Sequence, residues 1–389
     1  MIYLDNAATT RPHEYVVRDM LPYLYGEYGN PSAVYKHGRK AADAVEGARA
    51  KVAKFLHTTP EHIVFTSGGS EGNNMVLRGL TGYLKSTGRQ TIVTTPTEHP
   101  SVLRTLTGLI KDGFDIRFLP ITTQGIVDMS EFDNYIQEDV GLVSAMYVNN
   151  ETGAVNPVKE IAARCHERGI LFHSDCVQAV AAFDVDVTDL ELDFATLSAH
   201  KIHGPKGVGA VYIRHPKFHL VDPLIIGGEE QEGGLRGGTE NVPGIVGFGT
   251  ACEIMEEPLN FRTLFLYELS EALKKQGSKH HIYVNSSDNA VGNILNIEIE
   301  GIDAETLILA MDQYDVCLSA GSACHSKSVE PSHVLKAMGL SDEEARSSLR
   351  ISASSDQTEQ DIIDAAHIMA ICIDKLDRIE AYVAIKGES

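Results

Sequence analysis

Between residues 60 and 215, short runs of apolar and β-branched residues alternate with longer amphipathic stretches. The strand-like runs are IVF at 63–65, TIVTT at 91–95, DIRFLPI at 115–121, LVSAMYV at 142–148, ILFHSD at 170–175, FATLS at 194–198 and VGAVYI at 208–213. Helical patterns occupy residues 71–84, 100–111 and 157–168. Such alternation predicts an α/β fold with a mostly parallel sheet flanked by helices on both faces. In that architecture ligands bind beyond the carboxyl ends of the strands.

The pattern changes after about residue 255, where the chain predicts a second, smaller α/β domain. Its expected elements are a helix at 259–275, a strand at 293–299, a helix at 304–313, a strand at 348–352 and a last helix at 358–381. A loop of small residues at 319–331 lies among them, and we expect it to be exposed and mobile. The glycine-rich stretch 227–238, between the two regions, is interpreted as a functional loop or hinge.

The charge balance excludes some partners. Lys and Arg number 33 against 54 Asp and Glu, a formal net charge of −21, so nucleic acid and anionic membrane surfaces are disfavoured. The start, MIYLDNAATT, lacks the basic and apolar regions of a secretory signal, and no window approaches the ~20 apolar residues that span a bilayer. We therefore expect a soluble, cytoplasmic protein. Its six cysteines contain no C-x-x-C pair, so neither a disulfide framework nor a zinc site is indicated.

Two residues near strand ends suggest carbonyl chemistry. Lys201 follows a predicted strand and has Ser198 and His200 as neighbours, so a desolvated amine there could form a Schiff base with an aldehyde cofactor. The alternative is an ordinary solvated lysine. Asp175 ends the run ILFHSD; if buried it needs a cationic partner, such as the protonated ring nitrogen of pyridoxal phosphate, and otherwise it is a helix cap.

Two further features are suited to holding anions. FTSGGSEGNN at 65–74 predicts a strand, a tight turn and a helix start, whose backbone amides and Ser70 hydroxyl could cradle a phosphate, although the same letters also suit a plain turn. The chain has no G-x-x-x-x-G-K-[ST] motif of nucleotide P-loops. Arg350, within SLRIS, could grip a carboxylate with two hydrogen bonds or could be an edge-strand arginine.

His99 and Cys324 are candidates for proton transfer and for a reactive thiol. His99 lies between a strand and a helix, where its near-neutral pKa suits proton transfer, although packing is the commoner role. Cys324 lies in the small-residue loop, and the adjacent His325 and Lys327 favour its thiolate. A metal site at His200 and His203 is disfavoured, because this H-x-x-H falls in a Gly- and Pro-containing loop without a third ligand nearby.

The motifs taken together are more specific than any one of them. In order along nearly the whole chain, they are YLDNAATT, GNPSAVYKHGRKA, FTSGGSEGNN, TEHPSV, YVNNETGAVNP, FHSDCVQAV, SAHKIHGPKGVGA, GGLRGGTENV, GSACHS with EPSHVLKAMGL, and SLRIS. This set resembles the cysteine desulfurases, in the class V branch of fold type I pyridoxal phosphate (PLP) enzymes. The GSAC…EPS loop is similar to the long-loop group, which supplies sulfur for iron–sulfur clusters and other thio-cofactors.

The resemblance implies a role for each matching residue. Lys201 would be the Schiff-base lysine, Asp175 would face the pyridine nitrogen, and His99 would stack on the ring and assist proton transfer. The other implied cofactor contacts are Gln178 at the phenolic oxygen, Asn150 beside the cofactor, Gly69, Ser70, Ser198 and His200 at the phosphate, and Thr239 reaching the phosphate across a dimer interface. Arg350, with Asn150, would bind the substrate carboxylate, and Cys324 would accept the sulfur.

The resemblance also implies an activity and an organisation. L-Cysteine would yield L-alanine and a persulfide on Cys324, which would pass sulfur to an acceptor such as an iron–sulfur scaffold or a thio-cofactor carrier. A homodimer is expected, with residues 1–15 joining the small domain and active site, 16–255 forming the large domain and 256–389 the small one. A selenocysteine lyase, an aminotransferase of the same fold and an inactive PLP-binding scaffold are alternatives. Ser70 and Cys176 stand where the family usually has Thr and Ala.

Overall fold

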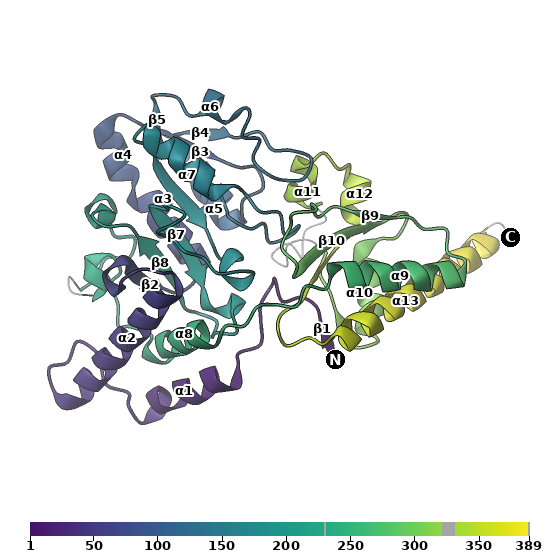
Figure 1. Cartoon of the computed structure of the whole chain (residues 1–389), viewed down its shortest axis with the longest axis horizontal. Helices are drawn as coiled ribbons and strands as arrows, with labels where there is room; N and C mark the ends of the chain where they lie inside the picture. Colours follow the sequence, from purple (N-terminus) through teal and green to yellow (C-terminus); the bar gives the residue numbers. More distant parts are fainter. Residues whose placement is uncertain (229–230, 321–330, 388–389) are drawn as a thin grey trace.

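The computed structural model describes residues 1–228, 231–320 and 331–387, which form two lobes (Figure 1). Among the described residues, the larger lobe contains a seven-stranded sheet whose strand order is β2-β8-β7-β6-β5-β3-β4. Its strands are β2 (Ile63–Thr66), β3 (Thr91–Thr94), β4 (Asp115–Phe118), β5 (Val140–Ser144), β6 (Leu171–Asp175), β7 (Phe194–Ser198) and β8 (Gly209–Ile213). Strands β4, β3, β5, β6 and β7 run parallel, and β8 is antiparallel to both β7 and β2. The prediction of a mostly parallel sheet is confirmed.

Helices cover both faces of this sheet, because successive strand residues point to opposite sides. Ile92 of β3 packs in one apolar cluster with the helices α3, α4 and α5, whereas Val93 packs in another with α2, α7 and α8. The helices of this lobe are α1 (Glu14–Tyr25), α2 (Lys36–Phe55), α3 (Gly69–Gly79), α4 (Thr81–Thr87), α5 (Pro100–Ile110), α6 (Phe132–Tyr135), α7 (Val158–Glu167) and α8 (Val242–Ile254). The sequences of these strands are almost continuously apolar because the sheet is buried on both faces.

The smaller lobe has its own sheet and its own apolar core. The antiparallel strands lie in the order β12-β10-β9, and β1 pairs in parallel with β11, which brings the start of the chain into this lobe (Figure 1). Its elements are β1 (Ile2–Tyr3), α9 (Arg262–Gln276), β9 (Ile282–Val284), β10 (Ile294–Ile299), α10 (Ala304–Asp312), β11 (Val316–Cys317), α11 (His333–Ala337), α12 (Asp342–Arg346), β12 (Ser348–Ser352) and α13 (Glu359–Gly387). The domain boundaries at residues 15 and 255 stay predictions.

Several predicted elements have other bounds in the structure; the strand predicted at 115–121, for example, ends at Phe118. The helix predicted at 71–84 is two helices that meet at Leu80, and α4 ends at Thr87, followed by Gly88 in the left-handed conformation. The strand predicted at 142–148 ends at Ser144, after which Val148 pairs with Val155 in a local turn. The sequence stays apolar up to residue 148, beyond the end of the strand, because the turn that follows the strand is also buried. Among the described residues, no helix is long and apolar enough to cross a bilayer.

Candidate active site

A cavity of about 250 Å³ lies at the carboxyl ends of the parallel strands. Ten of the sequence-predicted site residues line it: Gly69, Ser70, His99, Asn150, Asp175, Gln178, Ser198, His200, Lys201 and Arg350. Thr239 is exposed and is not among the lining residues of its own chain. Cys324 lies outside the described residues. Residues scattered from position 7 to position 350 therefore meet at one sheet edge.

The start of α3 forms one wall of the cavity. Gly68, the residue before the helix, has φ of 150°, which L side chains rarely adopt, and it offers no side-chain cap to the first turn. Close packing also demands a glycine at position 209, since a Cβ there would lie 2.8 Å from the Cα of Gly68. The first-turn N–H groups and the Ser70 hydroxyl thus border the cavity at the positive end of the helix.

Asp175 sits at the end of β6 and is 5% exposed. Its Oδ1 accepts a hydrogen bond from the backbone N–H of Val177 at 3.0 Å, and its Oδ2 accepts one from Asn73 Nδ2 at 2.7 Å. These bonds orient the carboxyl group toward the cavity it lines. A buried carboxylate held in this way is suited to pairing with a cationic group of a ligand.

Lys201 ends a short 3-10 helix, Ala199–Lys201, directly after β7. Its Nζ donates to the carbonyl oxygens of Ala7 and Ala8 at 2.5 and 2.9 Å. Gln178 Nε2 donates to the same Ala7 oxygen at 2.8 Å. The segment after β1 therefore closes the cavity beside the candidate amine, which periodicity gave no reason to expect.

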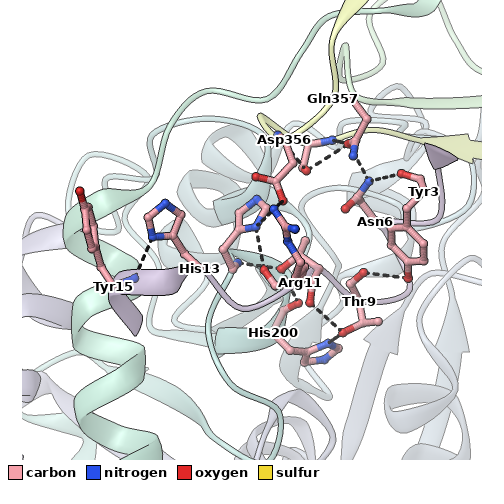
Figure 2. A network of polar contacts seen from close by, with 12 residues as sticks. Tyr3, Asn6, Thr9, Arg11, His13, Tyr15, His200, Asp356 and Gln357 are labelled. Atoms are coloured by element: carbon pink, nitrogen blue, oxygen red, sulfur yellow. Dashed lines mark hydrogen bonds and ion pairs between the residues drawn. The ribbon is translucent and has the colours of Figure 1, made fainter. Parts of the chain in front are cut away.

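His200 belongs to the polar network of this N-terminal segment, shown in Figure 2. Its Nδ1 lies 3.2 Å from Thr9 Oγ1, and the Thr9 carbonyl accepts a hydrogen bond from the Tyr3 hydroxyl at 3.0 Å. Burial, with Lys201 and Lys206 nearby, lowers the pKa of His200 to about 4. The ring is thus neutral at physiological pH when the cavity holds no anion.

His99 caps α5, and its ring lines the cavity. The backbone N–H of Ser101 donates to His99 Nδ1 at 3.1 Å, and Ser101 Oγ lies 2.8 Å from the same nitrogen. Burial lowers the pKa of His99 below its ordinary value, with Lys201 acting in the same direction and Asp175 opposing it. The imidazole is therefore neutral and held at a defined angle in the wall.

Arg350, on β12, is 1% exposed and is the largest fully buried side chain among the described residues. Its guanidinium donates to Asp5 Oδ1 at 2.7 Å and to the carbonyl oxygen of Asn150 at 3.0 Å. A guanidinium has five N–H groups, so these two bonds leave donors for a ligand. The small lobe thereby places a cation in a cavity that is otherwise lined by the large lobe and by Ala7 and Ala8 of the N-terminal segment.

The flanks of segment 321–330, which carries Cys324, are tied to the same site. On one side the backbones of Ser319 and Arg350 exchange hydrogen bonds at 3.2 and 2.7 Å. On the other side Ser332 Oγ donates to Glu151 Oε2 at 2.5 Å, and His333 Nε2 lies 3.0 Å from the carbonyl oxygen of Glu98. Both attachments therefore lie next to cavity residues or to their sequence neighbours.

Sequence reasoning missed several residues that complete the site. Asn73, 1% exposed, bonds both Asp175 and Ser101, and Asp5 bonds Arg350. A signal existed for Asn73, because it follows Gly69 by one helical turn and so lies on the same helix face. No local pattern signals the partnership of Asp5 with Arg350, since 345 residues separate them.

Two alternatives lose support from the structure. Cys176 is fully buried and does not line the cavity, and burial raises the pKa of its thiol to about 12, so it is an inert packing residue. Within the residues that the structure describes, no group of three or more His, Cys, Asp or Glu side chains is arranged to hold a metal ion.

Comparisons with known proteins agree on one family. The family profile described as aminotransferase class-V matches residues 2–364. The chain is 40% identical over 364 residues to the mitochondrial cysteine desulfurase of Saccharomyces cerevisiae, covering 93% of this chain and 72% of that one. It is 38% identical over 384 residues to cysteine desulfurase IscS of Dictyoglomus turgidum, covering 98% and 96%.

Solved structures give the same result. A structure titled NifS-like protein superposes with a TM-score of 0.87 at 34% identity, covering 96% of this chain and 99% of the other. Another, titled SspA in complex with cysteine, has a TM-score of 0.81 at 35% identity and covers 91% and 99%.

Proposed function

Because the chain belongs to the cysteine desulfurase family of the class-V aminotransferases, it is a PLP-dependent enzyme that removes sulfur from L-cysteine, and we propose which of its residues do so. The observation that carries this assignment is the convergence of Lys201, Asp175, His99 and Arg350 on one cavity of about 250 Å³. An amine, a carboxylate, a neutral imidazole and a carboxylate-binding cation together suit amino-acid chemistry on an aldehyde cofactor.

The residues present fit PLP. The start of α3 borders the cavity without a side-chain cap, which suits a phosphate. Gly69 also supports the fit, because a Cβ there would lie 2.9 Å from Val177 Cγ2 and crowd the wall. At the other side Asp175 is buried, with hydrogen bonds only from neutral donors among the described residues, which suits a protonated pyridine nitrogen.

The bound cofactor supplies an electron sink that stabilises negative charge at the substrate Cα. Lys201 would supply the amine that attaches the cofactor and the base that removes the Cα proton. Asp175 would keep the ring nitrogen protonated, and Gln178 and Asn150 would contact the cofactor and the substrate. Gly69, Ser70, Ser198 and His200 would hold the phosphate.

Arg350 binds the substrate carboxylate with the N–H groups that Asp5 and Asn150 leave available. Its burial excludes water from the pair, so the interaction orients the amino acid as well as holding it. His99, neutral and in the cavity wall, assists proton transfer during the reaction.

Cys324 accepts the sulfur. Its thiolate attacks the substrate sulfur, an S–S bond forms, and the C–S bond breaks with its electron pair going to the carbon fragment. That fragment takes up a proton and leaves as L-alanine, so the summed reaction of thiol and cysteine to persulfide and alanine is balanced without another oxidant. The attachment of both flanks of residues 321–330 at the cavity supports this role.

A homodimer is proposed with Thr239 reaching the partner's phosphate site. Large apolar side chains lie exposed on the described surface, where a second copy could cover them: Tyr25, Tyr28, Val34, Tyr35 and Ile226. The persulfide would serve a sulfur-acceptor protein, such as an iron–sulfur scaffold or a thio-cofactor carrier. The cytoplasmic location is likewise a proposal, and cell fractionation tests it against the mitochondrial and mitosomal locations named for several relatives.

The test is to incubate the purified PLP-loaded protein with L-cysteine and to quantify alanine and the persulfide on Cys324 by mass spectrometry. We expect equal amounts of both in a single turnover, and neither from the Cys324→Ala variant. Replacing cysteine by selenocysteine in the same assay tests the lyase alternative. A PLP-loaded protein that forms no alanine from cysteine would refute the residue assignment and favour an inactive scaffold.

A further inference from the structure

A chain of four polar side chains, all from residues that line the cavity, runs from the carboxylate of Asp175 to the imidazole of His99. Asn73 Nδ2 donates to Asp175 Oδ2 at 2.7 Å and to Ser101 Oγ at 2.8 Å. Ser101 Oγ in turn lies 2.8 Å from His99 Nδ1. This chain of hydrogen bonds joins β6 to α5 through α3. It links Asp175, which we assign to the ring nitrogen of the cofactor, with His99, which we assign to proton transfer.

The direction of each hydrogen bond follows from the chemistry of its partners. An ionised Asp175 can only accept, so Asn73 must present its amide nitrogen, and the reversed amide would set an oxygen against the carboxylate. Both Nδ2 hydrogens are then used, one on Asp175 and one on Ser101. Ser101 Oγ is thereby an acceptor from Asn73, and its own hydrogen is left to donate to His99 Nδ1.

A second donor acts on the same nitrogen. The backbone N–H of Ser101 lies 3.1 Å from His99 Nδ1, and a backbone amide cannot accept. Two donors on Nδ1 leave no room for a proton there. Burial lowers the pKa of the ring, and of the four titratable groups that act on it electrostatically, Lys201 and His333 also lower it, whereas Asp175 and Glu151 raise it; the net effect keeps the ring uncharged.

We propose that Asn73 and Ser101 are positioning residues that hold His99 as the tautomer with its single proton on Nε2. His99 then meets the cavity as a hydrogen-bond donor at Nε2 and not as a base. The consequence for the reaction rests on the proposed function: Lys201 removes the Cα proton, and His99 donates a hydrogen bond from Nε2 to the substrate. The tautomer itself follows from the hydrogen bonds alone.

The tautomer of His99 can be determined by ¹⁵N NMR of the histidine-labelled protein, a measurement that needs neither the cofactor nor enzymatic activity. The His99 resonances are assigned by their absence from the spectrum of the His99→Gln variant. We expect Nδ1 to resonate as an unprotonated, hydrogen-bonded nitrogen and Nε2 as a protonated one. A wild-type protein with the proton on Nδ1 would overturn the proposal.

The variants test the positioning role. In Ser101→Ala the Nδ1 resonance should move toward that of an unbonded ring nitrogen, and kcat should fall about fivefold with little change in KM, as expected for one lost hydrogen bond. Ser101→Thr should restore both readouts. Asn73→Leu should act in the same direction, and the double variant should lose no more than the larger single change, because both residues act through one chain.

Thr105→Val is the matched control, since it removes a hydroxyl one turn further along α5 that bonds Asn74 and does not line the cavity. It should leave the His99 resonances unchanged. If Ser101→Ala changes neither the resonance nor kcat, or if the effects of Asn73→Leu and Ser101→Ala simply add, the proposal is wrong. A wild-type protein with the expected tautomer but no alanine formation would instead refute the proposed function and leave this inference standing.

Discussion

Replacing Arg350 by Ala removes a guanidinium that, on our assignment, does two separable things. It pairs with Asp5 across 2.7 Å while it is 1% exposed, and it would bind the substrate carboxylate. Breaking a buried ion pair costs ~3–5 kcal/mol of folding stability, because the remaining charge has no partner. Asp5 is 17% exposed and can recover some solvation, so we expect a loss near the lower end, ~3 kcal/mol.

The catalytic loss has a different origin and magnitude. A charge-assisted hydrogen-bonded grip on a carboxylate contributes ~1.5–3 kcal/mol, which corresponds to a fall of about 10- to 150-fold in kcat/KM for cysteine. Denaturant unfolding followed by circular dichroism measures the first loss, and initial rates of alanine formation measure the second. Both are taken at the same pH and salt, since exposed charges are screened differently.

The double variant Asp5→Asn/Arg350→Ala separates the two effects. It removes the unpaired carboxylate, so stability should recover by about half of the loss, whereas kcat/KM should stay as low as in the single variant. A single variant that keeps kcat/KM within about twofold of the wild type would place the carboxylate grip elsewhere. Failure of the double variant to regain stability would refute the account of the Asp5 pair.

Three further predictions follow from single groups. Lys201→Ala should abolish the covalent cofactor adduct seen by mass spectrometry after borohydride reduction, whereas Lys206→Ala should keep it; an adduct in the first variant would disprove the lysine assignment. His173 is buried and bonded to Ser144 and Thr196, and burial lowers its pKa to about 4. Because the pKa of His173 in the folded protein lies below its unfolded value of ~6.5, the stability that the neutral ring contributes is complete above pH ~6.5 and is lost as the pH falls toward 4. The loss is at most ~3 kcal/mol. The free energy of unfolding of the His173→Gln variant should therefore depend less steeply on pH between about 4 and ~6.5. Iodoacetamide should leave the buried Cys165, Cys176 and Cys252 unmodified in the native protein and label them in urea; labelling of native Cys176 would contradict its burial.

Much of both sheets could be predicted from the sequence. Strands β7 and β12 have the predicted bounds, and β3, β6 and β10 differ by a residue or so, because buried strands in such folds are bounded by polar or turn residues. The prediction of one continuous helix at 71–84 was wrong, because the structure has two helices there. Leu80 is apolar and fits the helical period, so the break there has no signature in the residue pattern.

The candidate site, like the fold, could be predicted from the sequence only in part. Motifs selected Lys201, Asp175, His99 and Arg350 because each follows or interrupts a predicted strand, and the resemblance added their roles. Asn73 and Asp5 were missed, since their importance depends on partners 102 and 345 residues away. Contacts of that kind arise only when separate elements pack, and hydrophobic periodicity does not encode them.

The sequence by itself determined the class of fold, because periodicity and turn residues depend on local backbone preferences. Its motifs, through their resemblance to a family, indicated the kind of chemistry and proposed most of the reacting groups. Tertiary structure alone decided how those groups are oriented: which carboxylate faces Arg350, which carbonyl oxygens receive Lys201, and which nitrogen of His99 is left to carry the proton. Hydrogen bonds discriminate among such arrangements over a few tenths of an ångström. Only the packing of β6, α3 and α5 sets distances to that accuracy.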